Sequence, residues 1–426
     1  MGNNFEVLLE EWRRFEFPNI IERYIHPQPS SHITAIVGPR RAGKTFLLYL
    51  IARDLLRKYP RDNVIYVNFD DERIRKEPFE NLLEAIHKVF NPKGKIFLLL
   101  DEIQNVSNWS GWLGTLHNMQ KYSIFVAGSS SKLLSMEVAT SLRGRYISYT
   151  LLPFSFREFL KMKNIEERRT YIYEDVGLIK RLLDEYIEYG SFPEVIKEQS
   201  RIQKKRVLKT IFETIFFKDV VERFRIRNFD IARDILEFLL VNYSNKITIN
   251  KLYNFLSSIG RKVSKKTLWK YIYYFQQAFA VMLLEPLTSK KKRLLLPRKI
   301  YSIDTGISRL LDIEPSRGRL IENIVFLELV RRKERELFDI YYFYGRDYEV
   351  DFVVTEGRRV IRLIQVCYNI EDFEVARREI RGLMKAAKQL ECNNLEIITW
   401  DHEDIWNING LKVKLTPLWK WLLKPL

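Results

Sequence analysis

The sequence predicts an α/β protein whose N-terminal part is a doubly wound parallel sheet. Short apolar or β-branched runs alternate with helical patterns over the first 150 residues, and this alternation is typical of parallel sheets. A glycine-bearing loop separates the first such run from the first helix. After residue 151 the pattern becomes mainly helical, and a second mixture of strands and helices begins near residue 302. We therefore expect five segments, at 1–30, 31–150, 151–228, 229–301 and 302–426.

Composition limits the classes of protein to which the chain can belong. Hydrophobic residues make up 46% of its 426 residues, which is enough to bury several cores and excludes a disordered chain. Lys and Arg (71) exceed Asp and Glu (54), for a net charge of +17; this favours a polyanionic partner such as DNA, the alternative being a solubilising surface. Two cysteines are too few for a disulfide framework. Without a signal peptide or a run of about 20 apolar residues, we expect a cytoplasmic protein with no membrane partner.

The elements of the N-terminal part follow from the apolar runs. Residues 5–30 predict a short helical lead-in that ends near Pro27 and Pro29. A helix is expected at Thr45–Lys58. The four expected strands are Ile33–Val37, Asn63–Phe69, Ile96–Leu100 and Ser123–Ala127.

The middle of the chain predicts helices and then a winged helix-turn-helix. Residues 151–225 have a helical pattern that is broken at Tyr189–Pro193. Two apolar runs, Ala280–Leu284 and Leu294–Leu296, then flank a basic tip. Three short helices and a basic hairpin describe a winged helix. The three helices are Ile231–Tyr243, Ile249–Ser258 and Ser264–Phe279.

The C-terminal part predicts a smaller α/β module. Two helices are expected, one near Leu320–Lys333 and a long amphipathic one at Ile370–Leu390. The expected strands are Ile340–Tyr344, Tyr348–Val354, Val360–Cys367 and Leu395–Trp400.

The loop GPRRAGKT matches the pattern G-x-x-x-x-G-K-[ST] at every fixed position, between a buried strand and a helix. Its glycines permit a turn that directs backbone N–H groups at phosphates, and the helix N-terminus adds a positive end. Lys44 is expected to contact the β- and γ-phosphates, and Thr45 to bind Mg²⁺. The sequence therefore predicts a site for ATP and Mg²⁺. The loop comprises Gly38, Pro39, Arg40, Arg41, Ala42, Gly43, Lys44 and Thr45.

Two further strand ends carry candidate catalytic residues. Asp101 and Glu102 follow the apolar run of KIFLLLDEIQ, at the edge where ligands bind in open α/β sheets. Asp101 is expected to hold Mg²⁺ through water, and Glu102 to polarise the attacking water. Ser129, after the next strand, is a candidate to orient that water. Either Arg143 or Arg145 in SLRGR is a candidate arginine finger, in the same subunit or in a neighbouring one.

The order of these motifs resembles a known family. GPRRAGKT, LLLDEIQNVSNW, VAGSSSKLL, SLRGRYISYTLLPFSFREF and YGSFPEV occur in the order typical of the archaeal and bacterial AAA+ ATPases that carry a C-terminal nuclease-like domain. The resemblance implies an AAA+ P-loop core at 31–150, a helical lid at 151–228, a winged-helix domain at 229–301 and a restriction-endonuclease-like module of the PD-(D/E)XK type at 302–426. It also implies that Lys44, Thr45, Asp101 and Glu102 carry the ATP chemistry, with Ser129 as sensor and Arg145 as the arginine finger.

The nuclease-like module lacks one residue that cleavage by this fold requires. Nucleases of the fold use an acidic residue on a helix, an Asp on a central strand and E/Q-x-K on the next strand. The matching residues here are Glu322, Asp351 and Gln365, but Cys367 stands in place of the lysine. Because a neutral thiol does not supply the positive charge, we expect a degenerate module that does not cleave.

Basic residues cluster on the expected recognition helix and wing. Neither cluster contains an acidic residue, and such surfaces contact DNA phosphates. Ser264, Thr267 and Trp269 are candidate base or sugar contacts, although Trp269 also fits a core position. The basic residues are Arg261, Lys262, Lys265, Lys266, Lys270, Lys290, Lys291, Lys292, Arg293, Arg298 and Lys299.

The sequence favours an ATPase that couples hydrolysis to DNA binding or remodelling. An ATP-dependent switch acting on a protein partner and an ATP-gated nuclease are the alternatives. Whether the chain forms a homo-oligomer is left open.

Overall fold

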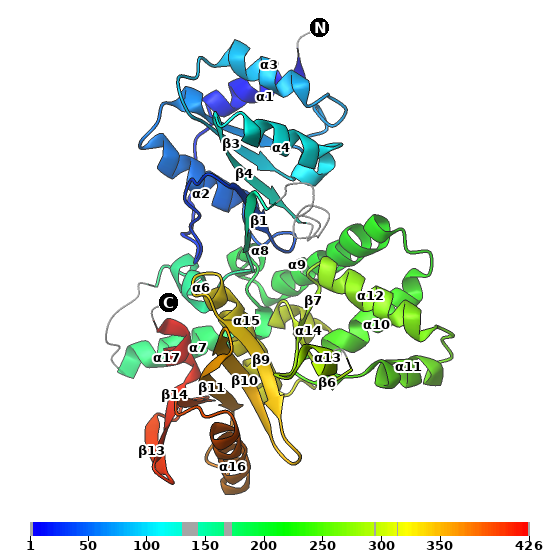
Figure 1. Ribbon diagram of the computed structural model, residues 1–426, viewed down its shortest axis with the longest axis vertical. Helices are drawn as coiled ribbons and strands as arrows, with labels where there is room; N and C mark the ends of the chain where they lie inside the picture. Colours follow the sequence, from blue (N-terminus) through cyan, green and yellow to red (C-terminus); the bar gives the residue numbers. More distant parts are fainter. Residues whose placement is uncertain (1–2, 130–143, 166–172, 294, 313, 425–426) are drawn as a thin grey trace. The chain divides into compact units, whose positions relative to one another are not determined.

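The computed structural model describes residues 3–129, 144–165, 173–293, 295–312 and 314–424. The chain divides into two compact units, Met1–Leu152 and Pro153–Leu426, and each is described by itself (Figure 1). In the described part of the chain, none of the helices combines the length and the hydrophobicity that a bilayer crossing requires.

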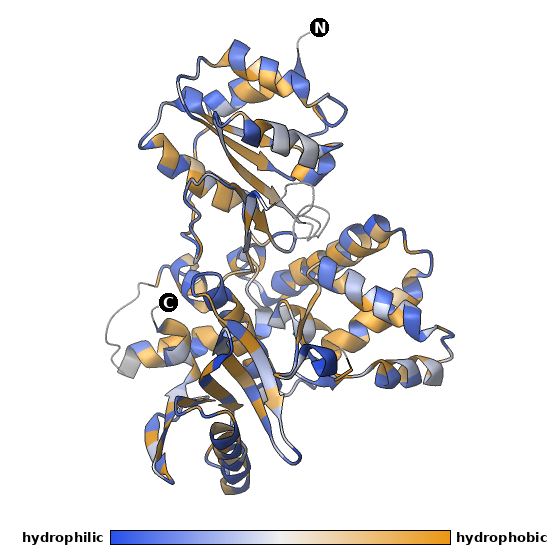
Figure 2. Cartoon of the chain, viewed as in Figure 1, coloured by the Kyte–Doolittle hydropathy of each residue, from blue (hydrophilic) through white to orange (hydrophobic). Residues whose placement is uncertain are grey.

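The N-terminal unit is built on a parallel sheet of five strands in the order β2-β3-β4-β1-β5. The predicted parallel sheet is thereby confirmed. The expected strands coincide with four of its members, and the fifth, at the sheet edge, was not predicted. The strands are β1 (Ile33–Val37), β2 (Val64–Asn68), β3 (Ile96–Asp101), β4 (Tyr122–Gly128) and β5 (Tyr146–Thr150). In Figure 2 the inner strands are orange because nearly every side chain on them is apolar and buried.

Helices cover this sheet. The lead-in helix α1 (Asn4–Arg13) buries Phe5, Leu9 and Trp12, and the indole N–H of Trp12 donates to the carbonyl oxygen of Val64 at 2.6 Å. The remaining helices are α2 (Lys44–Leu56), α3 (Glu80–Val89) and α4 (Trp109–Asn118), with short 3₁₀ turns η1 (Arg61–Asn63) and η2 (Ile103–Asn105).

The second unit begins with a helical segment, as the sequence predicts. The expected break at Tyr189–Pro193 separates its second and third helices. The helices are α6 (Phe156–Met162), α7 (Tyr173–Tyr189), α8 (Pro193–Lys197) and α9 (Arg201–Thr214), and α9 continues into the π-helical η4 (Ile215–Glu222).

Three helices, a small antiparallel sheet and the four-residue helix α13 follow, which together we call the three-helix module. The sheet order is β6-β8-β7. The run Leu294–Leu296 does not form the second hairpin strand, so that prediction was wrong. Leu294 lies outside the described residues, Leu295 is 84% exposed, and Pro297 has no N–H to donate to a ladder. The elements are α10 (Phe229–Val241), β6 (Lys246–Ile247), α11 (Ile249–Ser258), α12 (Lys265–Gln277), β7 (Val281–Leu284), α13 (Lys290–Arg293) and β8 (Arg298–Ser302).

The C-terminal sheet has six strands in the order β13-β14-β12-β11-β10-β9. Its central pairs β11–β12 and β12–β14 are parallel, and the outer pairs are antiparallel. The strands are β9 (Asp339–Tyr344), β10 (Glu349–Glu356), β11 (Arg359–Cys367), β12 (Leu395–Thr399), β13 (Asp404–Ile408) and β14 (Leu411–Pro417). The helices are α14 (Thr305–Leu311), α15 (Arg317–Lys333), α16 (Phe373–Gln389) and α17 (Leu418–Leu423).

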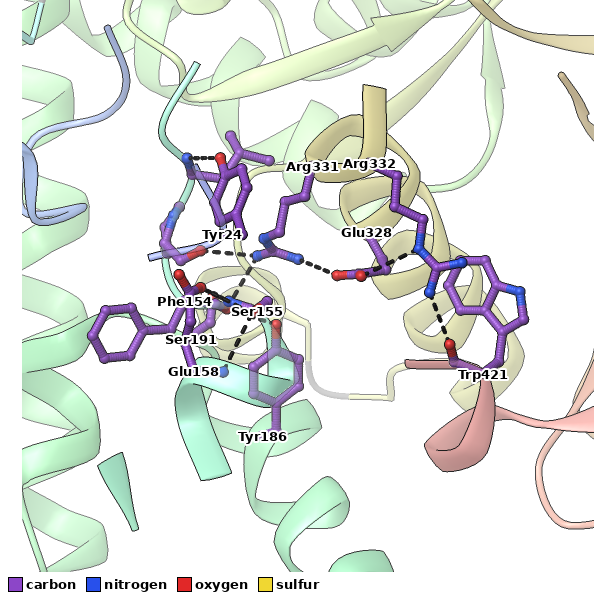
Figure 3. Close-up of polar contacts among 12 residues, drawn as sticks. Tyr24, Phe154, Ser155, Glu158, Tyr186, Ser191, Glu328, Arg331, Arg332 and Trp421 are labelled. Atoms are coloured by element: carbon purple, nitrogen blue, oxygen red, sulfur yellow. Dashed lines mark hydrogen bonds and ion pairs between the residues drawn. The ribbon is translucent and has the colours of Figure 1, made fainter. Parts of the chain in front are cut away.

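A buried polar network holds the second unit together (Figure 3). Arg331 on α15 donates to two backbone carbonyls at the start of the unit, that of Phe154 at 3.1 Å. Arg332 donates to the carbonyl oxygen of Trp421 at 2.8 Å and lies 4.0 Å from the centroid of its ring. Glu328 faces both guanidinium groups, at 3.5 and 3.4 Å. Because a buried charge is costly unless it is paired, this network fixes the first and last helices of the unit to α15.

The strings PFSFREF and YGSFP have structural roles in the same unit. Ser155 and Glu158 form a reciprocal capping box that begins α6. The backbone N–H and hydroxyl of Ser191 both donate to Asp304, at 2.6 and 2.8 Å. Gly190 has φ 74°, and a Cβ on it would lie 1.9 Å from a carboxylate oxygen of Asp304. Glycine is therefore required where the α7–α8 turn contacts α14.

Candidate functional site

The glycine-bearing loop follows β1 and leads directly into α2. Gly43 precedes the helix with φ 96°, a left-handed conformation that favours glycine. No described side chain caps this helix end, so its first N–H groups are directed out of the helix toward the loop. A Cβ on Gly38 would lie 2.1 Å from the carbonyl oxygen of Leu151, which requires glycine at that position as well. The loop is therefore suited to an anion such as phosphate.

Lys44, Thr45 and Asp101 meet beside this loop. The Lys44 ammonium donates to the carbonyl oxygens of Pro39 and Gly38, at 2.8 and 3.2 Å. The Thr45 hydroxyl donates to Asp101 Oδ2 at 2.6 Å. Burial raises the pKa of Asp101 to about 6, and the charge of Glu102 adds to this effect. A hydroxyl and a carboxylate at a helix N-terminus are the hard oxygen ligands that Mg²⁺ prefers, so the residues present fit this cation.

Glu102 and Ser129 lie at the carboxyl ends of adjacent strands, β3 and β4. Glu102 has a left-handed backbone, with φ 50°, which is uncommon for a residue other than glycine and recurs at functional sites. Gln104 donates to its carboxylate, and the Ser129 hydroxyl donates to Glu102 Oε2 at 3.4 Å. These contacts hold the Glu102 carboxylate at the sheet edge that carries the loop.

Arg145 lies at the amino ends of the strands, whereas the glycine-bearing loop lies at their carboxyl ends. It directly precedes β5, whose first residue is paired with Ile33, the first residue of β1, whereas the loop follows the last residue of β1. Five residues of strand separate the two ends by about 13–17 Å. The Arg145 guanidinium donates to Asn118 Oδ1 at 2.6 Å. Arg145 therefore does not reach the loop of its own subunit. Arg143 lies outside the described residues.

Arg23 is a residue of this site that sequence analysis missed. Its buried guanidinium donates to the carbonyl oxygen of Ala42, inside the glycine-bearing loop, and to that of Leu152, each at 2.7 Å. Arg23 therefore ties the loop to the segment that follows β5. Its position in an irregular segment gives no motif by which the sequence would reveal it.

The C-terminal sheet brings the three nuclease-pattern residues together. Asp351 on β10 and Gln365 on β11 are adjacent, because the Asp351 N–H donates to Gln365 Oε1 at 3.2 Å. The Gln365 amide in turn donates to Glu379 on α16 at 2.6 Å. Burial raises the pKa of Cys367 to about 12, so this thiol is neutral at pH 7, as predicted.

Lys299 occupies the centre of this cluster, and its assignment to a DNA-binding wing was wrong. Its ammonium is buried and lies 2.8 Å from Asp351 Oδ1, 3.0 Å from Glu322 Oε1 and 2.7 Å from Glu349 Oε1. Burial alone would lower its pKa, but the carboxylates, Asp351 foremost, outweigh burial and raise it well above its usual value. Strand β8 directs Lys299 inward, which a hydropathy pattern does not reveal for a lysine in a basic run.

One cation therefore faces three carboxylates in this carboxylate cluster. Burial, followed by the charge of Asp351, raises the pKa of Glu322 to about 8. The Tyr301 hydroxyl donates to Glu322 Oε1 at 2.7 Å. Among the described residues, no group of three or more His, Cys, Asp or Glu side chains is arranged to hold a metal ion. The Lys299 ammonium lies among the carboxylates that, by the family resemblance, would bind a metal cation.

The three-helix module has a basic surface on α12 and on the β7–β8 connection. Three of the predicted arginines are partly neutralised, because Arg261 pairs with Asp234 at 2.6 Å and both Arg293 and Arg298 lie near Glu285. Apart from the buried Lys299, the other predicted members are exposed, and the short helix α13 is deep blue in Figure 2. The exposed lysines are Lys262, Lys265, Lys266, Lys270, Lys290, Lys291 and Lys292.

Comparison with known proteins agrees with the geometry of the N-terminal unit. Residues 30–160 match a family model described as an AAA domain, and residues 180–317 match a domain of unknown function, DUF8612. The chain is 36% identical to the uncharacterized protein MJ1544 of Methanocaldococcus jannaschii over 425 residues, which cover 98% of this chain and 94% of that protein. The chain belongs to the same family as MJ1544. Its N-terminal unit is a nucleotide-binding AAA+ P-loop domain, which supports ATPase activity.

More distant matches come from other organisms. An uncharacterized protein of Haemophilus influenzae is 29% identical over 363 residues, covering 83% of this chain and 87% of that protein. Among solved structures, the Walker-type ATPase PABY2304 of Pyrococcus abyssi has a TM-score of 0.42 and 15% identity, covering 66% of this chain and 90% of that one.

Proposed function

We propose that this AAA+ protein hydrolyses Mg-ATP and couples hydrolysis to the binding or remodelling of DNA. The observation that carries the proposal is the set of seven exposed lysines on the three-helix module, in the same chain as a complete P-loop. Phosphate contacts from such lysines give affinity without sequence choice.

The ATP chemistry follows from the P-loop geometry. The loop N–H groups and Lys44 bind the phosphates, and Lys44 exchanges its carbonyl partners for them. Thr45 and Asp101 would hold Mg²⁺, which when bound neutralises phosphate charge. Glu102 accepts a proton from the attacking water, and Ser129 holds Glu102 in place. Arg145 serves a neighbouring subunit, because it does not reach its own P-loop.

The three-helix module supplies the DNA contacts in this proposal. Its helices and its β6-β8-β7 sheet have the order of a winged helix, with α12 as recognition helix and residues 285–297 as wing. The accompanying domain proposal is an AAA+ core at 31–150, a lid at 151–228, a winged helix at 229–301 and an endonuclease-like module at 302–426. The Lys299 ammonium, from β8, fills the carboxylate cluster of that module, so we do not expect nuclease activity.

The test measures ATP hydrolysis with duplex, forked and single-stranded DNA and with none. Stimulation by DNA is expected in wild type and is lost in a variant with Lys265, Lys266, Lys291 and Lys292 changed to Gln. A Lys205→Gln/Lys209→Gln variant, altered at exposed lysines of α9, serves as control and should retain stimulation. Glu102→Gln should abolish hydrolysis. Rates that no DNA changes, together with no DNA binding, would refute the coupling.

A second candidate function, an ATP-dependent switch acting on a protein partner, is favoured by one groove. This groove, of about 1100 Å³, lies between α16 and the β13–β14 hairpin. Its floor is apolar, formed by Ile380, Met384, Trp406, Ile408 and Leu411. Its rim is basic along α16, with Arg377, Arg381, Lys385 and Lys388.

The groove fits an amphipathic helix with an acidic edge. The basic rim extends over about 16 Å of α16 at 1.5 Å per residue, and apolar floors with charged rims bind helices by spaced anchors. Selection of helical peptides of about 15 residues should enrich acidic ones. The double variant Arg377→Glu/Arg381→Glu should no longer bind these peptides, whereas the control variant Lys412→Glu should still bind them. Enrichment without acidic character would contradict this candidate.

A further inference from the structure

From a pocket on the three-helix module we infer that the DNA bound by this protein contains an unpaired base, which stacks on Trp269. The inference rests on the proposed DNA-binding function and narrows the class of DNA to junctions between double and single strands, or to frayed ends. Four features of the module support it.

The first feature is the exposure of two aromatic rings on α12. Trp269 is 47% exposed and Tyr273 is 52% exposed, so neither is a core residue. Residues four apart lie on the same side of a helix, and the two rings form a short aromatic stripe. Exposed aromatic side chains among lysines are the arrangement that binds unpaired nucleotides, because every base has a face that can stack.

The second feature is a pocket of about 250 Å³ beside Trp269. It is lined by side chains from α12, from β7, from the start of α11 and from the connection that precedes β8. Its apolar members include Ile272, Leu283 and Pro297, and Asn250 and Thr248 supply polar groups. A small, mainly apolar pocket with few polar groups is the usual form of a site for a planar organic ring.

The third feature is the position of Arg298 at this pocket. Its guanidinium carbon lies 5.6 Å from the centroid of the Trp269 ring, a cation–π distance. Arg298 also pairs with Glu285 at 3.3 Å, so its guanidinium is held in place. The indole is thereby fixed on one side while much of its surface remains open to solvent.

The fourth feature is Leu295, which is 84% exposed at the same pocket. A large apolar side chain that is exposed to solvent on an otherwise basic surface indicates that a binding partner covers it. Proteins that open DNA insert such side chains between base steps. Lys266 and Lys270 lie near the two aromatic rings in the sequence of α12, and Lys291 and Lys292 precede Leu295. If two neighbouring base pairs were separated here, the phosphates on either side of them would lie near these lysines.

The experiment compares three DNAs on the full chain by fluorescence anisotropy. They are a blunt duplex of about 20 base pairs, the same duplex with about three unpaired nucleotides at one end, and the corresponding single strand. We expect the tailed duplex to bind about tenfold more tightly than the blunt one, as stacking of a base on an aromatic ring provides. A 2-aminopurine in the tail should lose fluorescence on binding.

Variants connect this preference to the pocket. Trp269→Leu should remove the preference for the tail and the 2-aminopurine quenching, while blunt-duplex affinity changes less than about threefold. Phe229→Leu, at an aromatic residue of α10 that is 45% exposed, is the matched control and should retain both. Equal binding of blunt and tailed DNA, or a preference that survives Trp269→Leu, overturns the inference and leaves the proposed function standing. A failure to bind any of the three DNAs overturns both.

Discussion

Two buried lysines, one in each unit, differ in the groups that they contact. Lys44 in the P-loop donates to two neutral backbone carbonyls, with the charge of Asp101 nearby, whereas Lys299 on β8 contacts three carboxylates. Hydrogen bonds to carbonyls are readily exchanged for stronger ones to phosphate, since charged acceptors bind an ammonium more strongly than neutral ones. An ammonium already paired with carboxylates gains little from a phosphate. The Lys44 ammonium can therefore exchange its carbonyl partners for a phosphate, whereas the Lys299 ammonium is held by its carboxylates and has a structural role.

The largest expected effect is on ATP hydrolysis. Lys44→Ala removes the phosphate contact and Glu102→Gln removes the base, so each should lower kcat by about 10² to 10⁴. Glu102→Gln should still bind ATP, and Lys44→Ala should bind it weakly, as measured by calorimetry. Lys299→Met should leave kcat within about twofold. A loss of hydrolysis in Lys299→Met comparable to that in Lys44→Ala would break the comparison.

The next effect is on the stability of the second unit. Lys299→Met leaves buried carboxylates without their cation, so the free energy of unfolding should fall by about 3–5 kcal/mol. Urea denaturation followed by circular dichroism measures this change. Lys292→Met, at an exposed lysine, is the control and should change stability by less than about 0.5 kcal/mol. Adding Glu349→Gln to Lys299→Met should recover part of the loss, because it removes one of the carboxylates that Lys299 contacts.

The third effect is a dependence of stability on pH. The pKa of Glu322 is raised to about 8 in the folded chain from its ordinary value of 4.5. Its contribution to stability is therefore fully present below pH 4.5 and is lost as the pH rises to about 8, by at most about 1.4 kcal/mol per pH unit. Glu322→Gln should flatten this part of the stability profile. An unchanged slope would show that Lys299, Asp351, Tyr301 and Glu349 set the charge of the cluster without Glu322.

The smallest expected effect concerns Arg145. Because this side chain does not reach the P-loop of its own subunit, Arg145→Ala should leave the hydrolysis rate of dilute protein within about threefold. It should also remove any rise of specific activity with protein concentration, which contact between subunits would produce. A large loss in dilute protein would contradict the placement of Arg145 at the amino ends of the strands.

The sequence predicted the P-loop domain well because its signals are local. The pattern of Gly38–Thr45 and the apolar run before Asp101 each specify a strand, a turn and a side-chain position within a few residues. The structure places Thr45 in contact with Asp101 as expected from strands whose carboxyl ends share one edge. The edge strand β5 was missed because its side chains are partly exposed, which weakens the hydrophobic signal.

The residues that were missed or misassigned depend on contacts between distant segments. Arg23 meets Ala42 and Leu152 across the fold, and no local pattern indicates such a contact. Lys299 was grouped with the wing because it follows a basic run, although it faces Asp351, 52 residues further along the chain. Charge and hydropathy describe each residue alone, whereas the burial of a lysine depends on which carboxylates the tertiary structure brings to it.

Two consecutive residues of strand β8 lie in different sites. Arg298 lies at the Trp269 pocket, and Lys299 lies in the carboxylate cluster. Side chains alternate between the two faces of a strand, so a shift of one residue exchanges them. A single-residue insertion or deletion between Leu295 and Arg298 would then expose Lys299 and bury Arg298. We expect β7–β8 connections of different length in homologues to differ between Leu287 and Arg293 and to keep the spacing from Leu295 to β8. The length of the β7–β8 connection is thus constrained by the side chains that β8 buries.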